Sequence, residues 1–128
     1  MNIQFNHKRK EEAYLPEGSY TFDGRLASRG GQTIALEVPP PWFIETLQSL
    51  DFFTKSVGKA RCSDEENYNK KTGRELAKSR MKPTVLTVLS NQDFGGVRIL
   101  VLEDMNKNKY ILEKRVGNKQ VHFIGYNE

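Results

Sequence analysis

The stretch TVLTVLSNQDFGGVRILVLEDMNKNKYILEKRVGNKQVHFIGY, residues 84–126, contains four short apolar runs separated by residues that favour turns. Asn, Asp and Gly concentrate in the separating segments 91–95, 105–108 and 117–118, as tight turns require. The apolar runs predict β-strands. The predicted strands cover residues 84–90, 96–103, 109–116 and 119–126. Because such short turns join antiparallel neighbours, the C-terminal part of the chain is expected to form a four-stranded meander.

The second of these strands carries apolar residues on both faces. Val97, Ile99 and Val101 point to one side of the predicted sheet, and Leu100 and Leu102 point to the other. A strand that is apolar on both sides is typical of the centre of a sheet. We therefore expect this strand to be central and the last two strands to be half exposed.

A proline triplet at 39–41 stops a predicted strand over 33–38 and predicts a short helix over about 41–50. Proline lacks the amide donor that a sheet needs, whereas its fixed φ suits the first turn of a helix. Apolar residues recur along this segment at helical spacing and are expected to face the core. These residues are Phe43, Leu47 and Leu50.

Trp42 lies on the flank of the predicted helix 41–50, and two interpretations of it stay open. It is either an exposed anchor for a partner protein or a half-buried residue that packs over Phe52 or Phe53.

Residues 63–66, SDEE, have the form of a capping box, in which the serine hydroxyl and the last glutamate satisfy each other's backbone amides. They predict a longer helix over 64–81, which Pro83 ends. A thin apolar stripe is expected to dock this helix, and it consists of Tyr68, Thr72 and Leu76. Gly73 in the middle of the helix indicates the close approach of another backbone.

The predicted fold class is α+β, with one domain over residues 1–128, because a chain of this length supports a single core. The C-terminal meander is expected to pack with the helices 41–50 and 64–81. The other predicted strands cover residues 3–5, 19–22, 33–38 and 55–61.

The chain carries 20 Lys and Arg against 16 Asp and Glu, a net charge of +4. The excess lies in residues 55–82, which hold nine basic and four acidic side chains. On a helix over 64–81 most of these basic residues share a face, which either binds phosphates or an acidic protein surface or is simply solvated. The candidate partner-binding or nucleic-acid-binding residues are Lys70, Lys71, Arg74, Lys78 and Lys82, with Arg115 and Lys119 on the terminal strands.

Two smaller features allow similar alternatives. The basic cluster at 7–10 either binds phosphate or forms a solvated strand end. Tyr110 and Tyr126 on the terminal strands either stack on nucleic-acid bases or cover the open face of the meander.

Signals for catalysis and metal binding are thin. The chain has one cysteine, Cys62, and two histidines, His7 and His122, so it lacks zinc-ligand spacing and places no base near the thiol in sequence. Motifs for phosphate-binding loops, metalloproteases and serine hydrolases do not occur. The acid pair 103–104 is interpreted as a solvated strand end. We expect no enzymatic activity, no cofactor and no metal site.

No apolar run approaches the roughly 18 residues of a membrane span, and residues 1–5 lack the apolar stretch of a signal peptide. We therefore expect a cytoplasmic protein that has no membrane partner.

The segment 58–80, GKARCSDEENYNKKTGRELAKSR, resembles a module of small bacteriophage and prophage accessory proteins. This module runs approximately as A-x-C, a polar acidic cap, an aromatic residue, and then G-x-x-L/I-A-x-x-R. The matching residues are Cys62, Asp64, Tyr68, Gly73, Leu76, Ala77 and Arg80. The resemblance implies a phage or prophage origin, and hence the cytoplasm of a bacterial host, without implying an activity.

An accessory protein of this kind has two candidate roles, both non-enzymatic. The first is an inhibitor or modulator of a host protein, such as a nuclease or another nucleic-acid-handling complex, that acts by protein contact in the manner of anti-CRISPR and other anti-defence proteins. The second is direct binding of DNA or RNA through the basic helix face. The modest net charge of +4 favours the inhibitor. A monomer and a homodimer are both compatible with the sequence.

Overall fold

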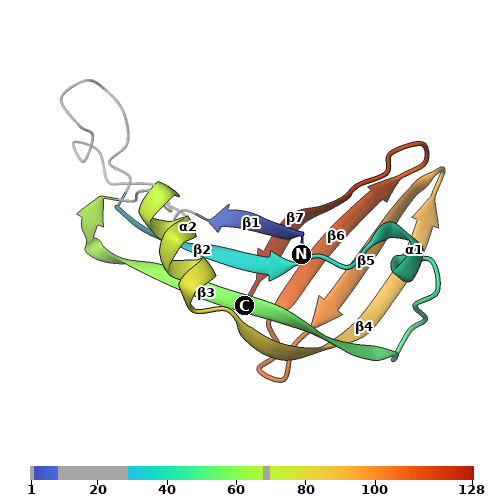
Figure 1. Cartoon of the computed structure of the whole chain (residues 1–128), viewed down its shortest axis with the longest axis horizontal. Coiled ribbons are helices and arrows are strands. Elements are labelled where there is room, and N and C mark those ends of the chain that lie inside the picture. Colours follow the sequence, from blue (N-terminus) through green and yellow to red (C-terminus); the bar gives the residue numbers. More distant parts are fainter. Residues whose placement is uncertain (1, 9–28, 68–69) are drawn as a thin grey trace, which may run out of the picture.

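The computed structural model describes residues 2–8, 29–67 and 70–128, which form one antiparallel sheet with two helices (Figure 1). The strands lie in the sheet in the order of the sequence, and the sheet curls until β1 approaches β7, so that a nearly closed barrel results. The strands are β1 (Ile3–Lys8), β2 (Arg29–Glu37), β3 (Phe52–Asn67), β4 (Lys82–Phe94), β5 (Val97–Glu103), β6 (Lys109–Arg115) and β7 (Val121–Asn127). The helices are α1 (Pro41–Ile44) and α2 (Lys70–Ser79).

This mainly β architecture corrects the α+β class that the sequence predicts. Helix α2 has 10 residues and begins at Lys70, whereas the sequence predicts a longer capped helix over 64–81. The backbone of 63–67 instead belongs to the 16-residue strand β3, in which Asn67 pairs with Arg29 of β2. A helix cap contributes only about 1 kcal/mol, so pairing of β3 with β2 at Cys62 and Asn67, on either side of this segment, overrides it.

The four C-terminal strands are confirmed, although β4 is longer than predicted. Residues 91–94 continue β4 and pair with β5, and the chain turns at Gly95 and Gly96, where φ is 61° and 91°. Both values lie in the left-handed region that glycine adopts without strain. Strand β5 lies between β4 and β6, as its sequence predicts. The predicted strand 19–22 lies outside the described residues.

The core lies inside the curled sheet, because side chains alternate between its two faces. On β2, Ile34 and Leu36 are buried in the core, whereas Thr33 and Ala35 face α2 on the outside. The buried core residues are Ile34, Leu36, Val38, Ile44, Leu47, Val57, Leu86, Val88, Leu100, Leu102, Tyr110, Leu112, Val121, Phe123 and Tyr126.

A side chain joins the two edges of the sheet. The Gln4 amide of β1 donates a hydrogen bond to the carbonyl of Val121 in β7. The amide of Phe123 donates in return to Gln4 Oε1 at 2.7 Å. Gln4 therefore makes both bonds that a strand backbone would offer to β7, which satisfies part of an otherwise exposed edge.

Helix α1 closes one end of the barrel. Ile44 and Leu47 are buried in the core, and Asn91 Nδ2 of β4 donates to both of their carbonyls, at 2.9 and 3.0 Å. The helix ends at Ile44, earlier than the predicted 41–50, and Phe43 packs against the core. The prediction for Leu50 is wrong, because this residue has a φ of 72° and is 77% exposed.

Trp42 lies on the surface of α1. Its side chain is 69% exposed and meets Phe43 edge-on, with ring centroids 5.9 Å apart. Phe43 in turn meets Phe53 edge-on at 5.4 Å, whereas Phe52 is 74% exposed. Of the two interpretations of Trp42, the exposed one therefore agrees with the structure.

Helix α2 packs on the outer face of β2 and β3 through small residues. At Gly58 of β3, a Cβ atom would overlap the carbonyl oxygen of Ala77 and would lie 2.8 Å from the amide nitrogen of Met81. Gly73 instead meets the side chain of Thr33, so the backbone approach predicted for this glycine is wrong. The buried alanines of the contact are Ala35, Ala60 and Ala77.

Replacing Gly58 by alanine is expected to lower the free energy of unfolding by about 1–3 kcal/mol, because the new Cβ forces α2 away from β3. Chemical denaturation of the purified protein measures this loss. The control is Thr54→Ala at an exposed position of the same strand, which should change the stability by less than about 0.5 kcal/mol. Equal stability of the two variants would contradict the close contact.

Candidate functional site

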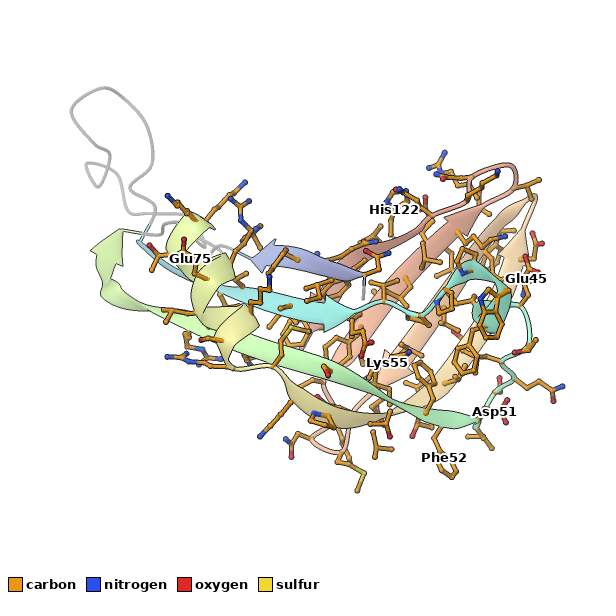
Figure 2. All side chains as sticks on the ribbon, viewed as in Figure 1. Glu45, Asp51, Phe52, Lys55, Glu75 and His122 are labelled. Atoms are coloured by element: carbon orange, nitrogen blue, oxygen red, sulfur yellow. The ribbon has the colours of Figure 1, made fainter. Side chains whose placement is uncertain are left out.

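Four basic side chains form a row along the exposed side of α2, here called the basic row: Lys70, Lys71, Arg74 and Lys78. Three of them recur every four residues, so they follow one another along the helix. Among the described residues, none of the four has an ion-pair partner. Glu75 is the one acid of this helix and is also exposed (Figure 2).

The positive field of the basic row reaches the neighbouring strand β1. His7 accepts or donates a hydrogen bond between Nδ1 and Thr33 Oγ1 at 3.0 Å, and its ring stacks near Phe5. Burial lowers the pKa of His7, and the charges of Lys70 and Arg74 lower it further. Such an effect is typical of cations that no neighbouring acid neutralises.

A pocket of about 380 Å³ opens at the α2 end of the barrel. Strand β3 pairs with β4 only as far as Val57, which faces Lys82 at the start of β4. Beyond Val57, β3 continues beside β2 but no longer pairs with β4. The pocket lies where β3 and β4 diverge. Its charged and aromatic lining residues are Lys59, Arg80, Lys82, Asp104, Tyr110 and Tyr126.

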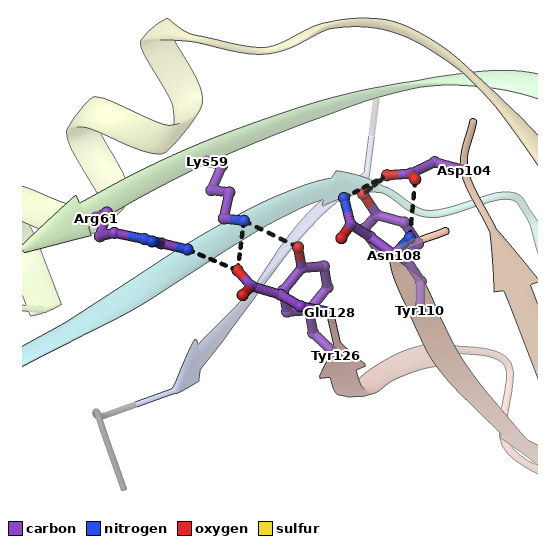
Figure 3. A network of polar contacts seen from close by, with 7 residues as sticks. All are labelled: Lys59, Arg61, Asp104, Asn108, Tyr110, Tyr126 and Glu128. Atoms are coloured by element: carbon purple, nitrogen blue, oxygen red, sulfur yellow. Dashed lines mark hydrogen bonds and ion pairs between the residues drawn. The ribbon is translucent and has the colours of Figure 1, made fainter. Parts of the chain in front are cut away.

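A network of polar contacts joins β3 to the end of β7 at this pocket (Figure 3). One oxygen of Glu128, Oε1, accepts from Lys59 Nζ at 2.6 Å and from Arg61 Nη2 at 2.7 Å. Lys59 also donates to the hydroxyl oxygen of Tyr126 at 3.1 Å. Burial acts to lower the pKa of Lys59, but its bonds to Glu128 and Tyr126 outweigh burial and raise it. Contact with Lys59 lowers the pKa of Glu128.

On the opposite wall, Asp104 organises the turn between β5 and β6. Its Oδ1 accepts from the backbone amides of Asn106 and Asn108, at 2.9 and 3.0 Å. Its Oδ2 accepts from the Tyr110 hydroxyl at 2.8 Å and from Asn108 Nδ2 at 3.1 Å (Figure 3). Burial is the largest cause that raises the pKa of Tyr110, and the hydrogen bond to Asp104 raises it further. This tyrosine therefore stays protonated and fixed.

The structure divides the predicted site residues between the two ends of the barrel. The basic row lies on α2, and Lys82, which begins β4 and is not part of a helix, lines the pocket. Arg115 ends β6 and pairs with Glu113 at 2.7 Å, and Lys119 follows in the turn before β7, at the end away from α2 (Figure 1).

Tyr110 and Tyr126 are buried in the core, 3% and 4% exposed. Of the two interpretations, base stacking disagrees with the structure, because neither tyrosine offers an exposed ring; both belong to the core that covers the inner face of the sheet.

Sequence reasoning missed Lys59, Arg80, Asp104 and Glu128 as neighbours in one site. A signal for Lys59 existed, because it follows the core residue Val57 by two positions in a strand and so points to the same inner face. The other residues meet it through tertiary folding, which leaves no local pattern.

No family model, curated protein or solved structure matches the chain. Neither helix within the described residues is long and apolar enough to cross a membrane. In the same part of the chain, no three His, Cys, Asp or Glu side chains are grouped to hold a metal ion.

Changing Lys70 and Arg74 to glutamine is expected to raise the pKa of His7, because both positive charges disfavour its protonation. Titration of the His7 ring followed by NMR measures the shift. The control is Lys109→Gln, which removes one cation on β6 that pairs with Glu103. A His7 pKa that stays the same in all variants would show that the field of the basic row does not reach β1.

Proposed function

We propose that the protein is a non-enzymatic binding protein of phage type whose ligand is a nucleic acid, held by the basic row of α2. The observation that carries the proposal is the set of four exposed cations without an ion-pair partner among the described residues. Phosphate contacts by such cations release counterions from the nucleic acid, which supplies most of the affinity of sequence-independent binding.

The spacing of the row supports a nucleic-acid backbone as its ligand. Lys70, Arg74 and Lys78 are four residues apart, or about 6 Å along the helix axis. Phosphates of one DNA strand advance by about 3.4 Å each along a duplex. Because successive phosphates also turn about the duplex axis, by roughly a tenth of a turn per step, their separation exceeds this rise and is comparable to the spacing between neighbouring cations of the row.

The net charge of +4 predicts modest rather than tight binding of nucleic acid. Glu75 lies on the same helix, and its carboxylate repels phosphates that the lysines attract. Affinity is expected in the micromolar range or weaker at physiological salt, as for other sequence-independent contacts (about 10⁻⁴–10⁻⁶ M).

Two matched double variants test this role of α2. Lys71→Glu with Lys78→Glu should weaken the binding of a fluorescent oligonucleotide by tenfold or more. The slope of log affinity against log salt concentration should decrease by the amount that about two phosphate contacts contribute. Arg115→Glu with Lys119→Glu makes the same change in net charge at the other end of the barrel and should leave binding nearly unchanged. Glu75→Gln should tighten binding. Fluorescence anisotropy at several salt concentrations provides the readout.

An equal loss in both double variants would contradict the proposal, because it would reflect net charge and not the basic row. Absence of binding by the unchanged protein at low salt would contradict it as well.

A second candidate function is inhibition of a host protein by direct contact, and the exposed apolar side chains near α1 favour it. Trp42, Leu50 and Phe52 are 69%, 77% and 74% exposed. Large exposed aromatic residues are frequent anchors of protein interfaces. This surface lies at the end of the barrel that α1 closes, so it leaves the basic row free.

Capture of binding partners from a nuclease-treated bacterial lysate distinguishes the two candidate functions. If a host protein is bound through the apolar surface, Trp42→Ala and Phe52→Ala should each reduce its retention while oligonucleotide binding stays unchanged. Met105→Ala is the control, since Met105 is 82% exposed in the turn between β5 and β6. Retention that is insensitive to Trp42 and Phe52 would exclude this surface.

A further inference from the structure

The pocket at the α2 end of the barrel has the size of a small-molecule site. Its volume of about 380 Å³ falls within the usual range for ligand pockets. Ile34 and Val57 are core residues that contribute an apolar wall, and Met105 contributes an apolar rim. The pocket therefore offers room and an apolar surface for more than a simple ion.

The charges that line the pocket favour an anion. Lys59 comes from β3, Arg80 follows the end of α2, and Lys82 begins β4, so three segments each supply one cation. Asp104 is the one acid among the described residues that line the pocket, and both of its oxygens already accept hydrogen bonds from its own turn and from Tyr110. Arg80 Nη1 donates to the Lys59 carbonyl at 3.3 Å, which holds the guanidinium at the pocket wall.

The Glu128 side chain shows where an anionic group sits beside this pocket. Its Oε1 accepts from both Lys59 and Arg61, at 2.6 and 2.7 Å, an arrangement that a phosphate oxygen can also adopt (Figure 3). The Glu128 side chain is 47% exposed. An exposed ion pair contributes little free energy, so a better anion can displace this carboxylate.

Tyr126 adds a hydrogen-bond donor to the same position. Its hydroxyl oxygen accepts from Lys59, and its own hydroxyl proton has no acceptor among the described residues. The Tyr110 hydroxyl, in contrast, donates to Asp104. One of the two tyrosines can therefore donate to a ligand oxygen that replaces Glu128, while the other holds the opposite wall in place.

We infer that this pocket binds a terminal phosphate group on an organic body of mononucleotide size, and that Glu128 occupies the phosphate position when no ligand is bound. The phosphate would meet Lys59, Arg61 and Tyr126, and the organic body would lie against the apolar wall. Two sources offer this chemistry: a free mononucleotide and the 5′-phosphorylated end of a strand. Only the second source rests on the proposed nucleic-acid function.

Titration of the full chain with AMP, adenosine and inorganic phosphate, followed by calorimetry or NMR, tests the site. AMP should bind more tightly than either fragment. Lys59→Gln should weaken AMP binding by tenfold or more, as expected for loss of a hydrogen bond between charged groups. Glu128→Gln should tighten it by about two- to fivefold, because a competing exposed ion pair is removed. Lys109→Gln on β6, whose partner is Glu103, is the control and should have no effect.

A second arm identifies the source of the phosphate. If a strand end is the ligand, an oligonucleotide with a 5′-phosphate should bind more tightly than the same oligonucleotide with a 5′-hydroxyl, and Lys59→Gln should abolish the difference. The inference is overturned if neither AMP nor a 5′-phosphate gives binding that depends on Lys59. The proposed function is contradicted by a separate result: binding of the 5′-hydroxyl oligonucleotide that does not change when charges of the basic row are reversed.

Discussion

The backbone of β3 meets the last turn of α2 at Gly58, and the shape of one end of the barrel depends on this contact. Up to Val57, β3 pairs with β4, but from Gly58 onward it runs beneath the helix. Arg80 then donates to the Lys59 carbonyl, so the segment after α2 satisfies part of the strand edge that β4 leaves open. The divergence of β3 from β4 creates the pocket, which Arg80 and Lys82, the residues that follow α2 in the chain, help to line.

The two ends of the barrel differ because different groups fill them. At one end, Ile44 and Leu47 of the α1 segment enter the core, and Asn91 holds their carbonyls. At the other end, the described residues bring charged side chains together, and Lys59 and Arg61 both pair with Glu128. Cations that border a pocket favour an anionic ligand over a neutral one. The candidate anion-binding features therefore lie at the α2 end, whereas the candidate protein-binding surface lies at the α1 end.

The sequence predicts the strands better than the helices. The physical reason is the distance along the sequence between the residues that interact. Alternation and turn residues are local signals, so the four C-terminal strands are confirmed from 84–126 alone. The capping pattern at 63–66 is local too, but β3 continues through these residues and pairs with β2 on either side of them, at Cys62 and Asn67. Helical spacing correctly places Lys70, Arg74 and Lys78 along one helix. The pocket escapes prediction because Glu128 reaches Lys59 across 69 positions of the sequence, and only closure of the barrel brings the two together.

Mapping amide chemical shifts during titration with a 5′-phosphorylated oligonucleotide tests the central claim, that the α2 end of the barrel is the binding end. The account predicts that the shifts concentrate in α2, in residues 58–61 of β3 and in residues 80–84 at the start of β4. Shifts that concentrate instead around Trp42 and Phe52, or in the turn between β6 and β7, would contradict it.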